Sequence, residues 1–257
     1  MIDYGDNASL DACDFYLLKR SRFYFKRELP VDAWRLFANT VAPRLPSRRF
    51  RSRAGLQQQM QKFQPISLGL APEFEPHRPG LVVPKTADIF FAGSTAGLSE
   101  RERGLAELLA LRERGVKVDI PEGRLDRPRF FERCAAAHLV WSPEGFGWDC
   151  LRHYEAAACG SVPVINYPSI RRYAPQDDGV HALFYAPEPG GLTRAVLDAL
   201  RDKPRLAEMG RHASLHARQF HDRTAIGRYV VETCLGVGKE QADRDRARTE
   251  ILPGQQD

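Results

Sequence analysis

Residues 142–165 combine carboxylates, a glycine-bearing loop and a basic side chain between two apolar runs. Glu144 lies in the loop, and Arg152 and Glu155 lie three residues apart near the start of the next helix, on one face. An arginine beside a helix N-terminus suits a diphosphate, and a carboxylate farther along suits a ribose or sugar diol. The pattern therefore indicates a site for a nucleotide that carries a diphosphate and a sugar. The alternative is that Arg152 and Glu155 form an ordinary surface ion pair.

A second candidate site follows an upstream apolar run, at residues 93–97 (GSTAG). Gly93 lets the backbone approach a ligand, Ser94 supplies a hydroxyl, and Arg101 and Arg103 lie one turn into the next helix. Together these groups could hold a phosphate. The segment has neither a Walker A sequence nor G-x-G-x-x-G, so a plain tight turn is the alternative.

Both stretches belong to a regular alternation of strands and helices. The expected strands are residues 87–92, 116–120, 138–142, 162–165 and 181–185, and the expected helices are residues 99–114, 128–137, 149–159, 191–201, 204–218 and 222–235. We expect Ser99 and Asp149 to cap their helices. This alternation predicts an α/β fold with a doubly wound parallel sheet, in which ligands bind beyond the carboxyl ends of the strands. Residues 57–85 are expected to form a linker with one short strand, residues 65–69.

Residues 142–165 resemble the donor-binding signature of GT-B glycosyltransferases of the family 4 type, approximately S-x-x-E-G-F-G-x-x-x-x-E-A-x-A-C-G-x-P-V-I. Residues 178–187 (DGVHALFYAP) are similar to the D-G-x-x-G-x-L-x-x-P element of that family, and the likeness covers about residues 88–235. The resemblance implies the Rossmann-like C-terminal half of a GT-B enzyme. It also implies a nucleoside-diphosphate sugar as donor substrate, with no cofactor and no obligatory metal.

The resemblance also implies roles for individual residues. Glu155 would bind the donor ribose, and Glu144 would contact the donor sugar. Arg152 would stabilise the departing diphosphate, because the R-H-Y-E form of the motif is similar to that of a bacterial subgroup. The remaining donor-binding positions implied are Gly93, Ser94, Pro143, Gly145, Phe146, Gly147 and His153. A satisfied packing histidine is the alternative for His153.

Two features depart from the family pattern. Ten residues separate Glu144 from Glu155 where the family usually has seven, because residues 148–150 are extra. The basic pair that stabilises the diphosphate in the family follows the first strand, so Arg101 and Arg103 compete with Arg152 for that role.

The resemblance also predicts how the chain is divided. Residues 10–30 resemble the last strand and helix of the first GT-B domain, and about 85 residues are too few for a whole domain. We therefore expect residues 1–85 to be a remnant of the acceptor-side domain plus a linker, and residues 86–237 to be the donor-binding domain. Residues 238–257 are expected to be a disordered tail. The acceptor half would be missing, reduced or supplied by another subunit.

Composition limits the remaining classes of function. The 257 residues carry 38 Lys+Arg and 33 Asp+Glu, a net charge of +5, and 43% are apolar, enough for a folded core. Residues 17–53 hold eleven basic residues and two acidic ones. This basic segment could contact an anionic membrane or a partner subunit, or be a solvated face. We do not expect a nucleic-acid partner.

With no secretory signal, membrane span or C-x-x-C pair, we expect a cytoplasmic location, at the inner face of the membrane if the basic segment docks there.

We therefore expect a glycosyltransferase that transfers a sugar to a glycan, lipid or other acceptor, with retention implied by the resemblance alone. The alternative is a non-catalytic nucleotide-sugar-binding subunit that docks through its basic segment. His212, His216 and His221 have a spacing that could suit a metal, but no H-E-x-x-H motif is present. A hydrolase is not supported, because the sequence contains no G-x-S-x-G elbow.

Overall fold

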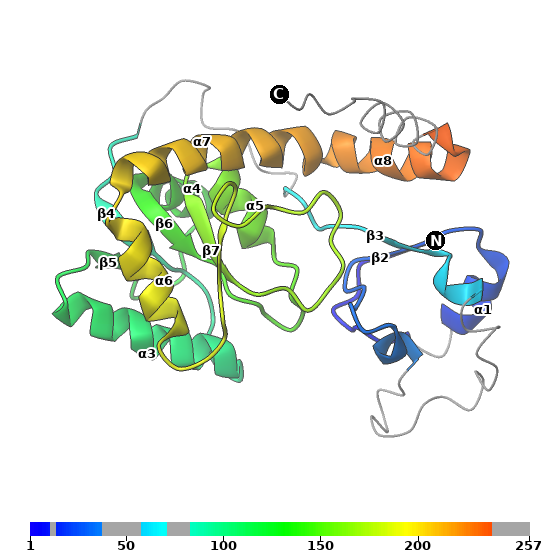
Figure 1. The fold of residues 1–257 in the computed structure, drawn as a ribbon, viewed down its shortest axis with the longest axis horizontal. Coiled ribbons are helices and arrows are strands. Elements are labelled where there is room, and N and C mark those ends of the chain that lie inside the picture. The colour runs from blue at the N-terminus through cyan, green and yellow to red at the C-terminus, as the bar shows by residue number, and fades with distance from the viewer. Residues whose placement is uncertain (11–13, 38–57, 71–82, 238–257) are drawn as a thin grey trace, which may run out of the picture.

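The computed structural model describes residues 1–10, 14–37, 58–70 and 83–237, and these contain two parallel β-sheets (Figure 1). The larger sheet has the order β5-β4-β6-β7-β8, and every neighbouring pair of strands is parallel. Its strands are β4 (Ala87–Phe90), β5 (Val118–Asp119), β6 (Ala137–Trp141), β7 (Val162–Asn166) and β8 (Leu183–Tyr185). The predicted parallel sheet is confirmed, and its apolar runs reflect burial on both faces.

Helices cover both faces of this sheet. They are α3 (Ser99–Glu113), α4 (Arg127–Ala136), α5 (Leu151–Ala158), α6 (Gly191–Leu200) and α7 (Lys203–Phe220). Leu139 and Trp141 of β6 belong to a core cluster with α3 and α6, whereas Val140 between them packs with α4 and α5 on the opposite face. Side chains alternate along a strand in this way, and the sheet is therefore doubly wound, as predicted.

A smaller sheet lies in the N-terminal part of the chain. Its order is β1-β2-β3, all parallel, with β1 (Ile2–Asp3), β2 (Tyr24–Lys26) and β3 (Phe63–Pro65), accompanied by α1 (Asp14–Arg20) and the 3-10 helix η1 (Ala33–Phe37). Its buried core consists of Leu10, Leu18, Tyr24, Leu29, Leu36, Phe37 and Phe63. This N-terminal unit therefore has a sheet and a core of its own, which is more than the predicted final strand and helix. The strand predicted at residues 65–69 lies earlier, at β3.

The helix α8 (Arg223–Leu235), the last one in the described residues, joins the two units (Figure 1). Ile226 packs with Phe25 and Ile66 of the N-terminal unit, and the Tyr229 hydroxyl donates to the Pro65 carbonyl at 3.0 Å. The tail predicted at residues 238–257 lies outside the described residues.

Two predicted helix caps are wrong. The N-cap of α3 is Leu98, so Ser99 is the first helical residue rather than the cap. Cys150 rather than Asp149 is the N-cap of α5. The Asp149 carboxylate is buried and accepts the backbone N–H of Leu68 at 2.7 Å. That contact joins residues far apart in the sequence, which is why local spacing misplaced the cap.

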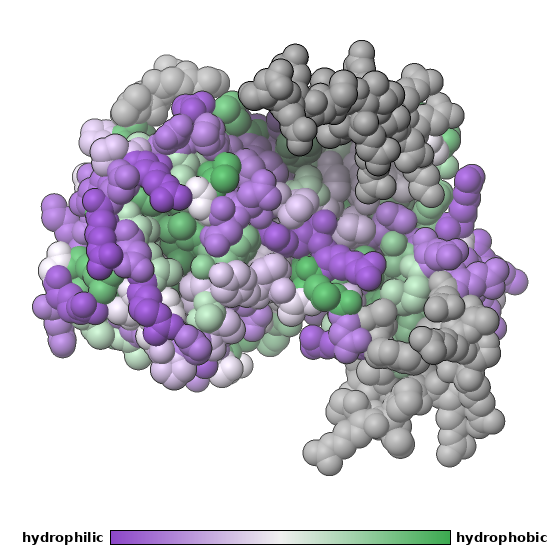
Figure 2. Space-filling model, in the orientation of Figure 1, coloured by the Kyte–Doolittle hydropathy of each residue, from purple (hydrophilic) through white to green (hydrophobic). Residues whose placement is uncertain are grey.

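The basic segment is described only for residues 17–37, and two of its charges serve the N-terminal fold. Lys26 is 1% exposed, with its Nζ 2.8 Å from Asp3 Oδ2, and the buried Arg27 pairs with Asp6. Lys19, Arg20, Arg22 and Arg35 remain exposed. Figure 2 shows hydrophilic side chains interspersed with small apolar areas over the coloured surface. Within the described residues, no helix is long and apolar enough to cross a membrane.

Candidate functional site

The candidate site lies at the carboxyl edge of the larger sheet. The chain leads from β4 into Gly93 and Ser94, from β6 into the loop of residues 142–150, and to the end of β7 at Asn166. Because β4, β6 and β7 are neighbouring parallel strands, these ends meet at one edge. The helix α5 begins directly after the 142–150 loop and carries Arg152 in its first turn.

Arg101 connects two of these loops by hydrogen bonds. Its Nε donates to the Glu144 carbonyl at 2.9 Å, and its Nη1 donates to the Ser94 carbonyl at 3.0 Å. Its Nη2 lies so close to Gly145 that an added Cβ would be 2.9 Å away. Arg101 therefore has a structural role, because it links the two loops, and most of its N–H donors are already in hydrogen bonds.

Arg152 is the cation with spare hydrogen-bonding capacity. Its Nε and Nη1 are buried, and neither has a hydrogen-bond partner among the described residues. Its guanidinium carbon lies 5.2 Å from the centroid of the Phe91 ring. Burial, and then the charge of Arg101, lower the pKa of Arg152. Two neighbouring positive charges, with unpaired donors on Arg152, favour an anionic ligand.

Gly93 makes room for this arginine. A Cβ at position 93 would lie 2.5 Å from Arg152 Nη2, closer than atoms can pack. We expected the lack of a side chain at Gly93 to let a ligand approach the backbone. In the structure, the Arg152 guanidinium occupies that space instead. Gly93 and Arg152 are thus brought together, as a phosphate-binding arrangement requires.

Asn166 holds Glu144 in place. The backbone N–H of Glu144 donates to Asn166 Oδ1 at 2.9 Å, and Asn166 Nδ2 donates to Glu144 Oε2 at 3.0 Å. Two residues along the same loop, Phe146 is 86% exposed, whereas Pro143 is buried. Asn166 thereby orients the Glu144 carboxylate at the sheet edge.

Glu155 lies deeper than expected. It is 4% exposed, and its Oε1 is 2.7 Å from Nη2 of Arg127 at the start of α4. A carboxylate buried this deeply does not form the surface pair that we considered for it. A ribose hydroxyl would have to share the carboxylate with Arg127.

His153 has a packing role. Its Nδ1 lies 2.7 Å from Ser142 Oγ, and its Nε2 lies 2.8 Å from the Trp148 carbonyl. Complete burial lowers the pKa of His153 to about 3, so the imidazole is neutral. With both nitrogens satisfied, His153 supports the loop rather than facing a phosphate.

Arg103 is not brought to the Gly93 turn. It pairs with Glu100 and donates to the Pro187 carbonyl at 2.9 Å, just beyond β8. Of the competing arginines, Arg101 and Arg152 therefore lie at the candidate site, and only Arg152 has buried nitrogens without partners among the described residues.

The fold has known relatives among solved structures. The chain aligns with a glycosyltransferase from Rickettsia africae at 12% identity and a TM-score of 0.53, over 90% of this chain and 69% of that one. Sucrose-phosphate synthase from Thermosynechococcus elongatus aligns at 14% identity and 0.52, over 88% and 71%. HepE from Anabaena, solved with UDP and glucose, aligns at 16% identity and 0.51, over 87% and 66%. The fold is that of the GT-B glycosyltransferases.

These likenesses establish the GT-B fold and leave the activity to be argued from the site. The sequence matches no protein-family model and no curated protein. The chain spans 66% of the HepE chain, just under two thirds of it.

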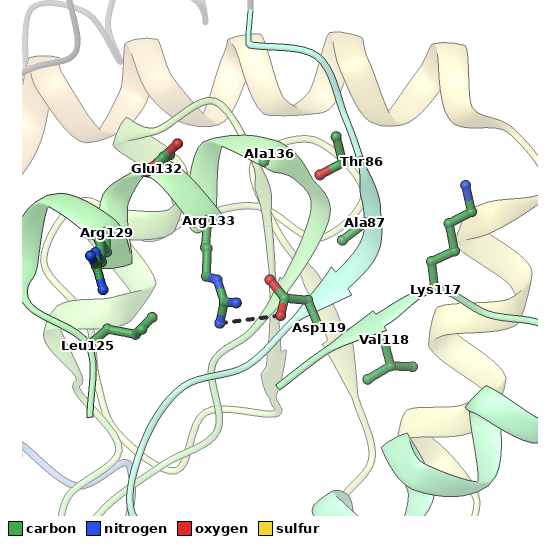
Figure 3. A pocket seen from close by; sticks show the side chains of 10 residues that line it. All are labelled: Thr86, Ala87, Lys117, Val118, Asp119, Leu125, Arg129, Glu132, Arg133 and Ala136. Carbon is green, nitrogen blue, oxygen red and sulfur yellow. Dashed lines mark ion pairs between the residues drawn. The ribbon is translucent and has the colours of Figure 1, made fainter. Parts of the chain in front are cut away.

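Within this GT-B fold, a groove of about 690 Å³ lies between α4 and the strands β4 and β5 (Figure 3). In its centre Arg133 Nη1 lies 3.5 Å from Asp119 Oδ1. The groove is lined by Thr86, Ala87, Lys117, Val118, Asp119, Leu125, Arg129, Glu132, Arg133 and Ala136. None of the predicted site residues is among them, so the groove is separate from the candidate site.

The three histidines of the metal alternative do not converge. The rings of His216 and His221 pack with their centroids 5.3 Å apart, whereas His212 contacts Arg211. Within the described residues, no group of three His, Cys, Asp or Glu could hold a metal ion.

Sequence reasoning missed three polar residues near the site: Asn166, Arg127 and Glu28. The signal for Asn166 was a polar residue directly after an apolar parallel strand. For Glu28 it was a carboxylate in an otherwise basic segment. Arg127 gave no signal, because only the packing of α4 on α5 brings it to Glu155.

Proposed function

We propose that this protein is a glycosyltransferase that binds a nucleoside-diphosphate sugar and transfers the sugar to an acceptor hydroxyl. The observation that carries the proposal is Arg152 at the carboxyl edge of a GT-B fold, with two buried nitrogens that have no partner in the described part of the chain. A diphosphate would supply acceptors for those nitrogens and offset the repulsion from Arg101.

The flanking carboxylates match the polyol parts of such a donor. Glu144, oriented by Asn166, would accept hydroxyl protons from the sugar. Glu155, beside Arg127, would accept them from the ribose. The exposed Phe146 ring and the backbone of residues 143–147 would lie alongside the donor.

The proposed reaction exchanges one bond at the anomeric carbon. The bond from this carbon to the diphosphate oxygen breaks, and a bond to the acceptor oxygen forms. The diphosphate leaves with the electron pair, stabilised by Arg152 and the N-terminus of α5, and takes up the proton that the acceptor hydroxyl releases. Arginine carries the charge, so the proposal needs no metal. Retention is proposed from the resemblance of the Glu144 loop to the family 4 signature.

Calorimetric titration with UDP, GDP, ADP and dTDP tests the donor site. We expect micromolar binding of one diphosphate, and then transfer from its sugar conjugate to a glycan or lipid acceptor. Failure to bind any of the four would refute the proposal.

A second candidate is a nucleotide-sugar-binding subunit without transfer activity, docked on a partner or on an anionic membrane. The exposed cations Lys19, Arg20, Arg22 and Arg35 favour it. Diphosphate binding without turnover, together with salt-sensitive binding to anionic vesicles, would support this candidate over the transferase.

A further inference from the structure

The N-terminal unit reaches the candidate site through Glu28. One carboxylate oxygen of Glu28, Oε2, accepts the backbone N–H of Trp148 at 2.9 Å, and the other, Oε1, accepts that of Asp149 at 2.9 Å. Glu28 is 3% exposed. Gly147 packs on it so closely that an added Cβ would lie 2.4 Å from Oε1. The loop before α5 therefore rests on a side chain from the other unit.

The residues after Glu28 hold a second loop of the same sheet edge. The backbone N–H of Arg171 donates to the Leu29 carbonyl at 2.7 Å, and that of Val31 donates to the Ser169 carbonyl at 3.1 Å. These partners lie between β7 and β8. The segment 28–31 thus runs between two loops that follow strands of the larger sheet.

The residues that Glu28 holds are among those that lengthen the spacing between Glu144 and Glu155 beyond the family pattern. Of these, Trp148 also donates its Nε1–H to the Asn166 carbonyl at 2.9 Å. Asp149 also accepts the backbone N–H of Leu68. The extra residues therefore serve as the attachment between the N-terminal unit and the donor-binding loop.

The contact has the features of a specific anchor. A buried carboxylate is unfavourable unless hydrogen bonds and a cation compensate for lost hydration. Glu28 has both, because Arg27 Nε lies 3.4 Å from its Oε1 and two backbone N–H groups donate to it. Burial nevertheless raises the pKa of Glu28 above its ordinary value.

We propose that Glu28 is a positioning residue for the nucleotide site: it holds residues 147–149 and thereby sets where α5 begins and where Arg152 lies. Glu28 itself contacts no reacting atom. The inference rests on the proposed function, because a positioned Arg152 matters only if it binds a diphosphate.

The test compares Glu28→Gln with the matched variant Asp3→Asn. Glutamine has nearly the same shape, but its NH₂ group would face one of the two backbone N–H donors. Asp3→Asn disturbs a partly buried ion pair, with Lys26, in the same small sheet but away from the loop. Two quantities are measured well below the melting temperature: hydrogen exchange at the amides of Trp148 and Asp149, and calorimetric affinity for the diphosphate that the wild type binds.

We expect Glu28→Gln to accelerate exchange at these two amides about tenfold or more and to weaken diphosphate binding about tenfold, with Asp3→Asn changing neither. Unchanged exchange in Glu28→Gln would overturn the inference whatever the wild type binds. Faster exchange with unchanged affinity would overturn the positioning role. If exchange accelerates but the wild type binds none of the four diphosphates, the proposed function fails and the anchoring of the loop by Glu28 stands.

Discussion

Replacing Arg152 by methionine should stabilise the ligand-free protein and weaken its binding of a diphosphate. Two nitrogens of Arg152 are buried with no partner among the residues that the structure describes, and leaving such groups unsatisfied costs about 1–3 kcal/mol. Methionine keeps an apolar contact with Phe91 and removes a charge beside Arg101. We therefore expect the free energy of unfolding to rise by about 1–2 kcal/mol, which for a chain of this size is about 2–8 °C in Tm.

The opposite change is expected when ligand is present. Each charge-assisted hydrogen bond contributes about 1.5–3 kcal/mol, so losing two should weaken diphosphate binding by about 10²- to 10⁴-fold. Thermal unfolding with and without the diphosphate measures both effects, and Arg133→Met, which breaks the ion pair with Asp119, is the control. A destabilised free protein, or a retained affinity for diphosphate, would refute this account of Arg152.

Three further changes test the neighbouring groups. Gly93→Ala places a methyl 2.5 Å from Arg152 Nη2, so the guanidinium must shift. Calorimetry should then show about tenfold weaker diphosphate binding, with little change in Tm. Unchanged affinity would contradict the role given to Gly93. Glu155→Gln should bind a nucleoside diphosphate and its 2′-deoxy form equally, whereas a discrimination equal to that of the wild type would exclude Glu155 from the ribose. Burial raises the pKa of Asp149 from 3.8 to about 6, so the folded state holds the extra proton between these values and stability falls as pH rises through them. In chemical denaturation, the unfolding free energy of the wild type relative to Asp149→Asn should fall by about 2 kcal/mol from pH 4 to pH 7; a constant difference would show that Asp149 does not titrate there.

The larger sheet could be predicted because its signals are local. The apolar runs at β4, β6 and β7 each end at a glycine, a proline or a polar residue, and parallel topology then fixes that these ends meet. The position of Arg152 followed from the same logic, since it lies in the first turn of α5, which begins at that edge. Local pattern was thus sufficient to bring the strand ends to one edge, although it misplaced the helix caps at Ser99 and Asp149.

Contacts between units could not be predicted in this way. The strands β1 and β2 have two and three residues, too few for any periodic pattern. Glu28 and Trp148 are 120 positions apart, and no feature of the sequence around either residue indicates that the other is its partner. The ion pair of Glu155 with Arg127 depends on how α4 packs against α5, so the sequence of one helix alone could not predict it.

The charges at the candidate site favour a whole nucleoside-diphosphate sugar over a diphosphate alone. Arg152 and Arg101 lie together, and the carboxylates of Glu144 and Glu155 come from the loop before α5 and from α5 itself. An isolated inorganic diphosphate would satisfy the arginines but would be repelled by nearby carboxylates. A ligand that carries hydroxyl groups beside its diphosphate gives acceptors to Arg152 and donors to Glu144 and Glu155, because hydroxyls donate to carboxylates without carrying charge. A nucleoside-diphosphate sugar has that order of groups, with the ribose on one side of the diphosphate and the sugar on the other.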